Sequence, residues 1–126
     1  MATVELTEDT LEKTIVENDI VIIDFWAPWC GPCKNFGPIY EEVSEKHSDI
    51  VFAKVNTEDE QAIAAHFQIR SIPTLMIFRE QIVLFSEAGM LPAAGLEQVI
   101  EQVKALDMEK VKAEVEAAQA EAEQKS

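Results

Sequence analysis

The two cysteines of this chain stand three residues apart, at the point where an apolar strand gives way to a helix. The strand is predicted by the run from Ile20 to Trp26, which is apolar at every position but one. The helix pattern that follows is expected over 33–47. The hexapeptide that carries both cysteines reads Trp29-Cys30-Gly31-Pro32-Cys33-Lys34. The fold must therefore hold two sulfurs close enough for a short disulfide at one strand–helix turn.

The position of each cysteine relative to the helix predicts its chemistry. A helix N-terminus presents unpaired N–H groups and the positive end of the helix dipole, and both favour an anion. Cys30 stands just ahead of the first turn, so its thiolate is expected to be stabilised and its pKa lowered. Cys33 lies inside the first turn and is expected to be the shielded thiol. Pro32 stiffens the link and suits the first helical position.

These residues resemble the active-site stretch of the thioredoxin family: Cys-Gly-Pro-Cys follows an apolar strand with a buried Asp, and a Trp flanks Ala-Pro on either side. The resemblance covers about residues 3–105. It implies an α/β, thioredoxin-like fold with a central mixed five-stranded sheet flanked by helices. It also implies a protein disulfide reductase that works by dithiol–disulfide exchange, with Cys30 as nucleophile and Cys33 as the resolving thiol.

A metal site and inert burial are the alternatives for a cysteine pair. A zinc site needs about four ligands, and this chain has only two cysteines. His47 and His66 fall on predicted helices without ligand spacing to the pair. Redox chemistry is therefore favoured, and no metal site is predicted.

Asp24 is the one charged residue in the apolar strand. An unpaired buried carboxylate is costly, and burial raises its pKa. It is either a hydrogen-bonded structural residue or a proton acceptor beneath the active-site turn. The resemblance implies the second role, with Asp24 accepting the proton of Cys33 through water and Lys54 lying near it.

The resemblance also implies a substrate-binding surface made by three loops around the cysteines. Ile72-Pro73-Thr74 looks like the family's cis-proline loop, whose backbone pairs with an extended substrate segment. Gly89 and Met90 match a third loop, and an apolar patch around Cys30 is expected. The residues assigned to substrate binding are Trp29, Gly31, Pro32, Ile72, Pro73, Gly89 and Met90.

Strand and helix patterns alternate along the chain, which favours parallel strands joined by right-handed crossovers. Strands are expected at 3–6, 50–56, 75–78 and 82–85, and helices at 8–17, 58–67 and 93–106, with Thr7 as the cap of the first. A hairpin joins the last two strands. Glu80 and Gln81 stand at its tip and do not favour positive φ, so a different turn type or a shifted register is predicted.

Composition limits the partners and the location. The net charge of −14 disfavours nucleic acid and anionic membranes. No membrane span and no signal peptide are recognised, so a cytoplasmic, monomeric protein is expected. The resemblance implies disulfide-containing protein substrates, and re-reduction by a thioredoxin reductase, a flavin- and NADPH-dependent partner. No bound cofactor is expected.

The chain divides into residues 1–106, the thioredoxin-like domain, and residues 107–126, an acidic, Ala-rich helical extension. Asp107 is expected to cap that helix, and Met108, Val111 and Val115 form a thin apolar stripe. The extension is either a solvated helix or a helix that binds a partner or a second copy. The alternative function is accordingly a thioredoxin-fold binding or co-chaperone module that uses this helix.

Overall fold

A mixed five-stranded sheet forms the centre of the molecule. The computed structural model describes residues 2–125. The strands lie in the order β1-β3-β2-β4-β5, with β1, β3 and β2 parallel, β4 antiparallel to β2 and β5 antiparallel to β4. The predicted fold class is confirmed, and the strand that precedes the cysteines, β2, is central. The strands are β1 (Thr3–Glu5), β2 (Ile20–Trp26), β3 (Val51–Asn56), β4 (Thr74–Arg79) and β5 (Ile82–Ala88).

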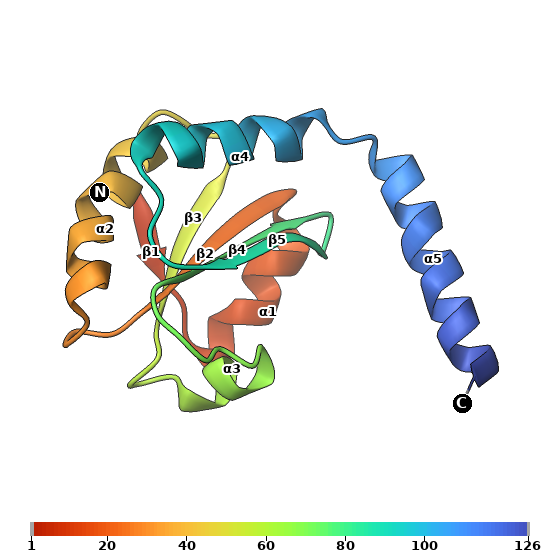
Figure 1. Ribbon diagram of the computed structural model, residues 1–126, viewed down its shortest axis with the longest axis horizontal. Helices are drawn as coiled ribbons and strands as arrows, with labels where there is room; N and C mark the ends of the chain where they lie inside the picture. The colour runs from red at the N-terminus through yellow and green to blue at the C-terminus, as the bar shows by residue number, and fades with distance from the viewer. Residues whose placement is uncertain (1, 126) are drawn as a thin grey trace.

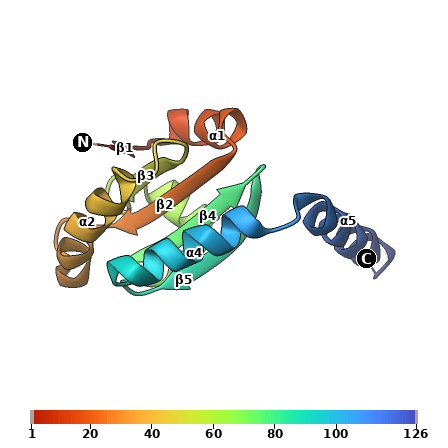
Figure 2. The ribbon, with the colours of Figure 1, turned by 90° about the horizontal axis from the view of Figure 1, so that it is seen from above.

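Helices cover both faces of the sheet, which explains why β2 is apolar almost throughout. Figures 1 and 2 show α1 (Glu8–Glu17) and α3 (Gln61–His66) on one face, and α2 (Gly31–Ser44) and α4 (Ala93–Ala105) on the other. Ile20 and Ile22 pack under α2 and α4, whereas Val21 and Ile23 pack under α1 and α3. Asp24 follows the even positions and therefore lies on the α2 side.

Two helix starts differ from the prediction, and α2 also ends at Ser44, three residues before the expected end. α2 begins at Gly31, two residues earlier than expected, because Cys30 itself is the N-cap. Pro32 is consequently the second helical residue, where a missing N–H is still harmless. α3 begins at Gln61 and not at residue 58, since Asn56 accepts the Glu58 amide and holds the preceding residues in a turn.

The predicted turn type of the β4–β5 hairpin is wrong. Glu80 and Gln81 have φ angles of 51° and 69°, so both central residues have the positive φ of a type I′ turn. The Glu80 amide donates to the Asp19 carbonyl at 2.8 Å, and the Glu80 carboxylate contacts Lys112. Contacts from distant parts of the chain thus hold the turn. The shifted register does occur, but inside the strands, between Ile77 and Phe78.

The C-terminal extension is a helix, α5 (Met108–Lys125), whose first turn is attached to the domain. The Asp107 carboxylate accepts the amides of Glu109 and Lys110, which confirms the predicted cap. Met108 is only 7% exposed. Arg79 fastens the preceding segment, because its guanidinium donates to three carbonyl groups at the end of α4. Beyond Lys112, whose ammonium group contacts Glu80, α5 projects away from the sheet (Figure 1).

None of the helices in the described part of the chain has both the length and the apolar composition that crossing a bilayer requires.

Candidate active site

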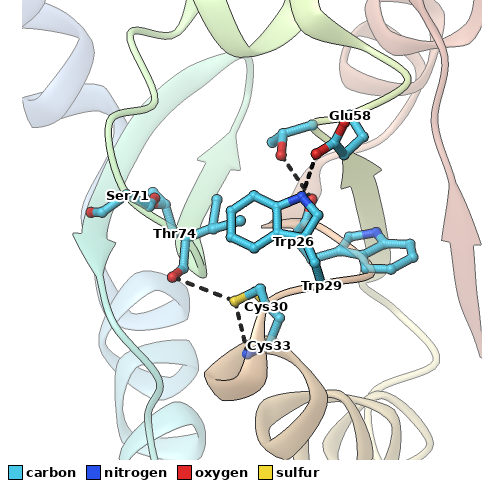
Figure 3. The surroundings of a disulfide bond; sticks show 9 residues. Trp26, Trp29, Cys30, Cys33, Glu58, Ser71 and Thr74 are labelled. Atoms are coloured by element: carbon cyan, nitrogen blue, oxygen red, sulfur yellow. Dashed lines mark hydrogen bonds between the residues drawn. A yellow bond between two sulfur atoms is a disulfide. The ribbon is translucent and has the colours of Figure 1, made fainter.

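The two cysteines form a disulfide at the N-terminus of α2. Their Cα atoms are 5.2 Å apart, and the pair lies where β2 ends and α2 begins. The Cys30 sulfur accepts the backbone N–H of Cys33 at 3.2 Å, as Figure 3 shows. A thiolate at Cys30 would therefore face a backbone donor and the positive end of the helix dipole.

Exposure does not distinguish the two cysteines in this disulfide state. Cys30 is 4% exposed and Cys33 is 5% exposed. They pack with Ala27, and Trp26 and Ile72 lie against the same small cluster. Burial is therefore nearly equal, and what separates the two cysteines is their position relative to the helix: Cys30 is the N-cap of α2, and Cys33 lies inside the first turn.

The loop before β4 lies against the cysteine pair. Antiparallel pairing sets Thr74 opposite Phe25, so residues 71–73 run beside the end of β2. The Ile72–Pro73 peptide bond is cis, which confirms the prediction. The carbonyl oxygen of Ile72 is 3.7 Å from the Cys30 sulfur. A backbone acceptor thus lies beside the Cys30 sulfur.

Gly89 joins the third loop to the proline loop. Its N–H donates to the carbonyl oxygen of Pro73 at 2.8 Å, and its φ of 99° lies in a region that side chains rarely adopt. The neighbouring Met90 is 41% exposed. The structure therefore brings together all three loops that the sequence assigned to one surface.

An apolar surface surrounds Cys30. Trp29 is 67% exposed, Ile72 is half-buried, and Gly31 and Pro32 are exposed at the start of α2. A cavity of about 180 Å³ lies between Trp29 and the segment 69–72. Trp29 is held in place by the Glu58 carboxylate, which accepts its indole N–H (Figure 3).

Glu58 and Thr57, which the sequence pattern did not identify, support the site from the loop after β3. The Thr57 hydroxyl and amide both donate to the Trp26 carbonyl, at 3.0 and 2.8 Å. Neither residue belongs to a local motif, and their partners lie about thirty positions away, with a separation of 31 for Thr57 and Trp26. Only the spatial pairing of β2 with β3 reveals them.

Asp24 is fully buried in β2, three residues before Ala27, which packs with the two cysteines. Its two carboxylate oxygens have no hydrogen-bond partner among the described residues. Burial raises the pKa of Asp24 to about 7, while Lys54 acts to lower that pKa and Glu5 to raise it. A buried carboxyl group whose pKa is raised toward neutral thus lies in the strand that leads into the cysteine turn.

Lys54 is aligned with Asp24 in the register of β2 and β3. Its ammonium group lies 4.7 Å from the centre of the Trp26 ring, a cation–π arrangement. Lys54 and Asp24 are therefore neighbours across the β2–β3 pair.

Residues 2–125 contain no group of three or more His, Cys, Asp or Glu side chains that could hold a metal ion. The chemistry that the site offers is that of its two sulfurs. A cysteine pair at a helix N-terminus, preceded by a strand that carries a buried carboxyl group, is the arrangement of a thiol–disulfide oxidoreductase.

Comparison with known proteins gives the family. The Thioredoxin family model matches residues 2–102, and the chain belongs to the thioredoxin family. "Putative thioredoxin 2" of Streptomyces coelicolor is 51% identical over 121 residues, covering 96% of this chain and 90% of that protein. The thioredoxin of Porphyra purpurea is 39% identical over 102 residues, covering 79% of this chain and 95% of that protein.

A solved structure of a mutant thioredoxin from Halobacterium salinarum superposes with a TM-score of 0.77 at 29% identity, covering 83% of this chain and 93% of that one. These matches support dithiol–disulfide exchange at Cys30 and Cys33, and they do not favour the binding-module alternative. The Streptomyces match is also informative about the extension. Because it spans 121 residues, it includes at least fifteen positions beyond residue 106.

Proposed function

We propose that this thioredoxin reduces protein disulfides with Cys30 as the nucleophile and Cys33 as the resolving thiol. The Cys30 thiolate attacks one sulfur of the target disulfide and releases the other target sulfur as a thiolate. The Cys33 thiolate then attacks Cys30 in the mixed disulfide. That step releases the second target thiol and leaves the Cys30–Cys33 disulfide. The observation that carries this assignment is the amide of Cys33 directed at the Cys30 sulfur, at 3.2 Å.

Asp24 is the proton acceptor for Cys33 in this proposal. Its full burial, its lack of a hydrogen-bond partner among the described residues and its pKa near 7 support that role. A group whose pKa lies near the working pH is best able both to accept and to return a proton. No direct contact joins the carboxylate to Cys33, so a water molecule would carry the proton. Lys54 favours the ionised form of Asp24.

The apolar surface around Cys30 is the substrate-binding surface. An extended target segment would pair with the proline loop at Ile72 and Pro73, while Trp29 and Met90 cover its side chains. Gly31 and Pro32 are exposed beside the disulfide, and Gly89 fixes the third loop against Pro73. The exposed area of Trp29 and Met90 supports this assignment.

The oxidised protein is re-reduced by an NADPH-dependent flavin reductase. The protein works in the cytoplasm, and it does so as a monomer. The test is reduction of insulin disulfides coupled to NADPH and a thioredoxin reductase. Catalytic consumption of NADPH that depends on both proteins is expected. NADPH consumption no faster than with the reductase alone would contradict the reductase assignment.

Alkylation should separate the two thiols. We expect limited iodoacetamide treatment of the reduced protein near neutral pH to label Cys30 first, because only Cys30 gains the stabilisation of the helix N-terminus. Peptide mass spectrometry identifies the labelled residue. Since both cysteines are equally buried in the disulfide form, faster labelling of Cys33 would reverse the assigned roles.

The chain divides into a catalytic domain, residues 1–106, and an extension, residues 107–126. A protein truncated after Asp107 should keep its insulin-reduction rate, because α5 contacts the domain at the β4–β5 turn, beside the start of β2, whereas the cysteines follow the end of β2. It should lose about 1–3 kcal/mol of unfolding free energy, the cost of removing buried Met108. Truncation after Val115 keeps Met108 and Lys112 and serves as the control, with stability close to that of the full chain. A lower rate in a folded truncated protein would contradict the division.

A further inference from the structure

A row of three charged residues crosses the sheet from the redox site to its edge. In the parallel register of β1, β3 and β2, Glu5 is aligned with Lys54, and Lys54 is aligned with Asp24. Aligned residues of parallel strands point to the same face, here the face that α2 covers. The row therefore has the ammonium group of Lys54 in the middle and one carboxyl group on each side of it.

Lys54 is not tied to either carboxyl group. Within residues 2–125, no ion pair of 4 Å or less joins its ammonium group to Asp24 or Glu5, and the group rests on the ring of Trp26. The positive charge of Lys54 thus acts on both carboxyl groups and forms a close ion pair with neither. The charge state of each carboxyl group should consequently affect the other.

The two ends of the row differ in their access to solvent. Asp24 is fully buried, whereas Glu5 is exposed at the edge strand. Glu5 lines a cavity of about 330 Å³ together with Trp26, Asn56, Asp59 and Glu60. The Glu5 carboxyl group can therefore exchange protons with solvent. Its charge then acts electrostatically on the buried carboxyl group of Asp24.

We propose that Glu5 is a positioning residue for disulfide exchange. Its carboxylate lies on the side of Lys54 opposite Asp24, offsets the positive charge of Lys54 and so favours the protonated form of Asp24. The inference rests on the proposed role of Asp24 as proton acceptor of Cys33. Lys54 alone would stabilise the Asp24 carboxylate and weaken it as a base. Glu5 offsets that effect and keeps the inner carboxyl group able to take up a proton near neutral pH.

The groups that face Asp24 limit the size of the effect. They are Lys54 from β3, Glu5 from β1 and the phenol of Tyr40 from α2. The pKa of Tyr40 is itself raised well above its usual value, mainly by burial and further by Asp24.

Adjacent strands are about 4.8 Å apart, so Glu5 and Asp24 are separated by about 10 Å. At that distance, a unit charge in a medium between protein surface and water changes a pKa by about 0.3–0.6 units.

The test is a carbon-13 NMR titration of the Asp24 carboxyl group in the oxidised protein, where the cysteines do not titrate. We expect Glu5→Gln to lower the pKa of Asp24 by about 0.3–0.6 units, a two- to fourfold change in proton affinity, and Lys54→Gln to raise it. About 1 M salt, which screens beyond roughly 3 Å, should shrink the effect of Glu5→Gln.

Glu41→Gln is the matched control, because Glu41 lies at the same edge and is bonded to β1 through Ala2 and Thr3. It should leave the pKa of Asp24 unchanged. No shift with Glu5→Gln, or an equal shift with Glu41→Gln, overturns the proposal. The pH profile of mixed-disulfide resolution should move with the NMR pKa in Glu5→Gln. If the NMR pKa moves and the profile does not, Asp24 is not the base, and the positioning role of Glu5 fails with it.

Discussion

Replacing Asp24 with Asn is expected to raise the unfolding free energy of the oxidised protein by about 2–4 kcal/mol at pH 8. The pKa of Asp24 is about 7 in the folded protein against an ordinary value of 3.8. The folded chain therefore binds this proton more tightly than the unfolded chain, and its stability falls as the pH rises from about 4 to 7. The difference between the two pKa values corresponds to about 4 kcal/mol of unfolding free energy. The gain is smaller than this because the buried Asn amide lacks hydrogen-bond partners, which costs stability.

Measurement at pH 4 is the internal control for this substitution. There Asp24 is protonated when folded, so Asn should add much less stability than at pH 8. Denaturant unfolding at both pH values gives the two differences, and mixed-disulfide resolution should slow more than the initial attack. A destabilised variant with unchanged turnover would make Asp24 a structural partner of Lys54 and nothing more.

Replacing Cys30 with Ser is expected to lower insulin reduction by at least about a thousandfold while leaving the fold intact. A hydroxyl group is not ionised at neutral pH and cannot form the mixed disulfide. Ser is, however, a favourable N-cap, so it can replace the Cys30 sulfur as acceptor of the Cys33 amide. Circular dichroism and thermal unfolding of the reduced proteins check the fold.

Cys30→Ala removes the thiol and the cap together and is the matched comparison. It should be as inactive as Cys30→Ser but less stable by about 1 kcal/mol. Substantial activity in Cys30→Ser would show that another group carries the chemistry.

The sequence predicted the fold well because its strongest signals are local. The apolar run of β2 matches the strand residue for residue, since burial on both faces leaves a continuous pattern. The resemblance supplied what pattern alone could not, including the cis bond before Pro73. The early start of α2 was missed because a cysteine is not among the usual N-cap residues.

The remaining features depend on contacts between distant residues. The turn at Glu80 and Gln81 has positive φ angles that its side chains do not favour, and its support comes from Asp19 and Lys112. Glu58 beside Trp29 and Glu5 beside Lys54 are likewise defined by strand pairing. No spacing within the sequence identifies such partners, because the sheet order brings them together.

The most direct test of the account is to trap the mixed disulfide with Cys33→Ser. Without its resolving thiol, the reduced variant should stop after the first exchange with a disulfide-bonded peptide. Mass spectrometry should then find one peptide half bound to Cys30, in a complex that dithiothreitol releases. A variant that forms no adduct, or a Cys30→Ser protein that forms a stable adduct at Cys33 at a comparable rate, would contradict the proposed roles of the two cysteines.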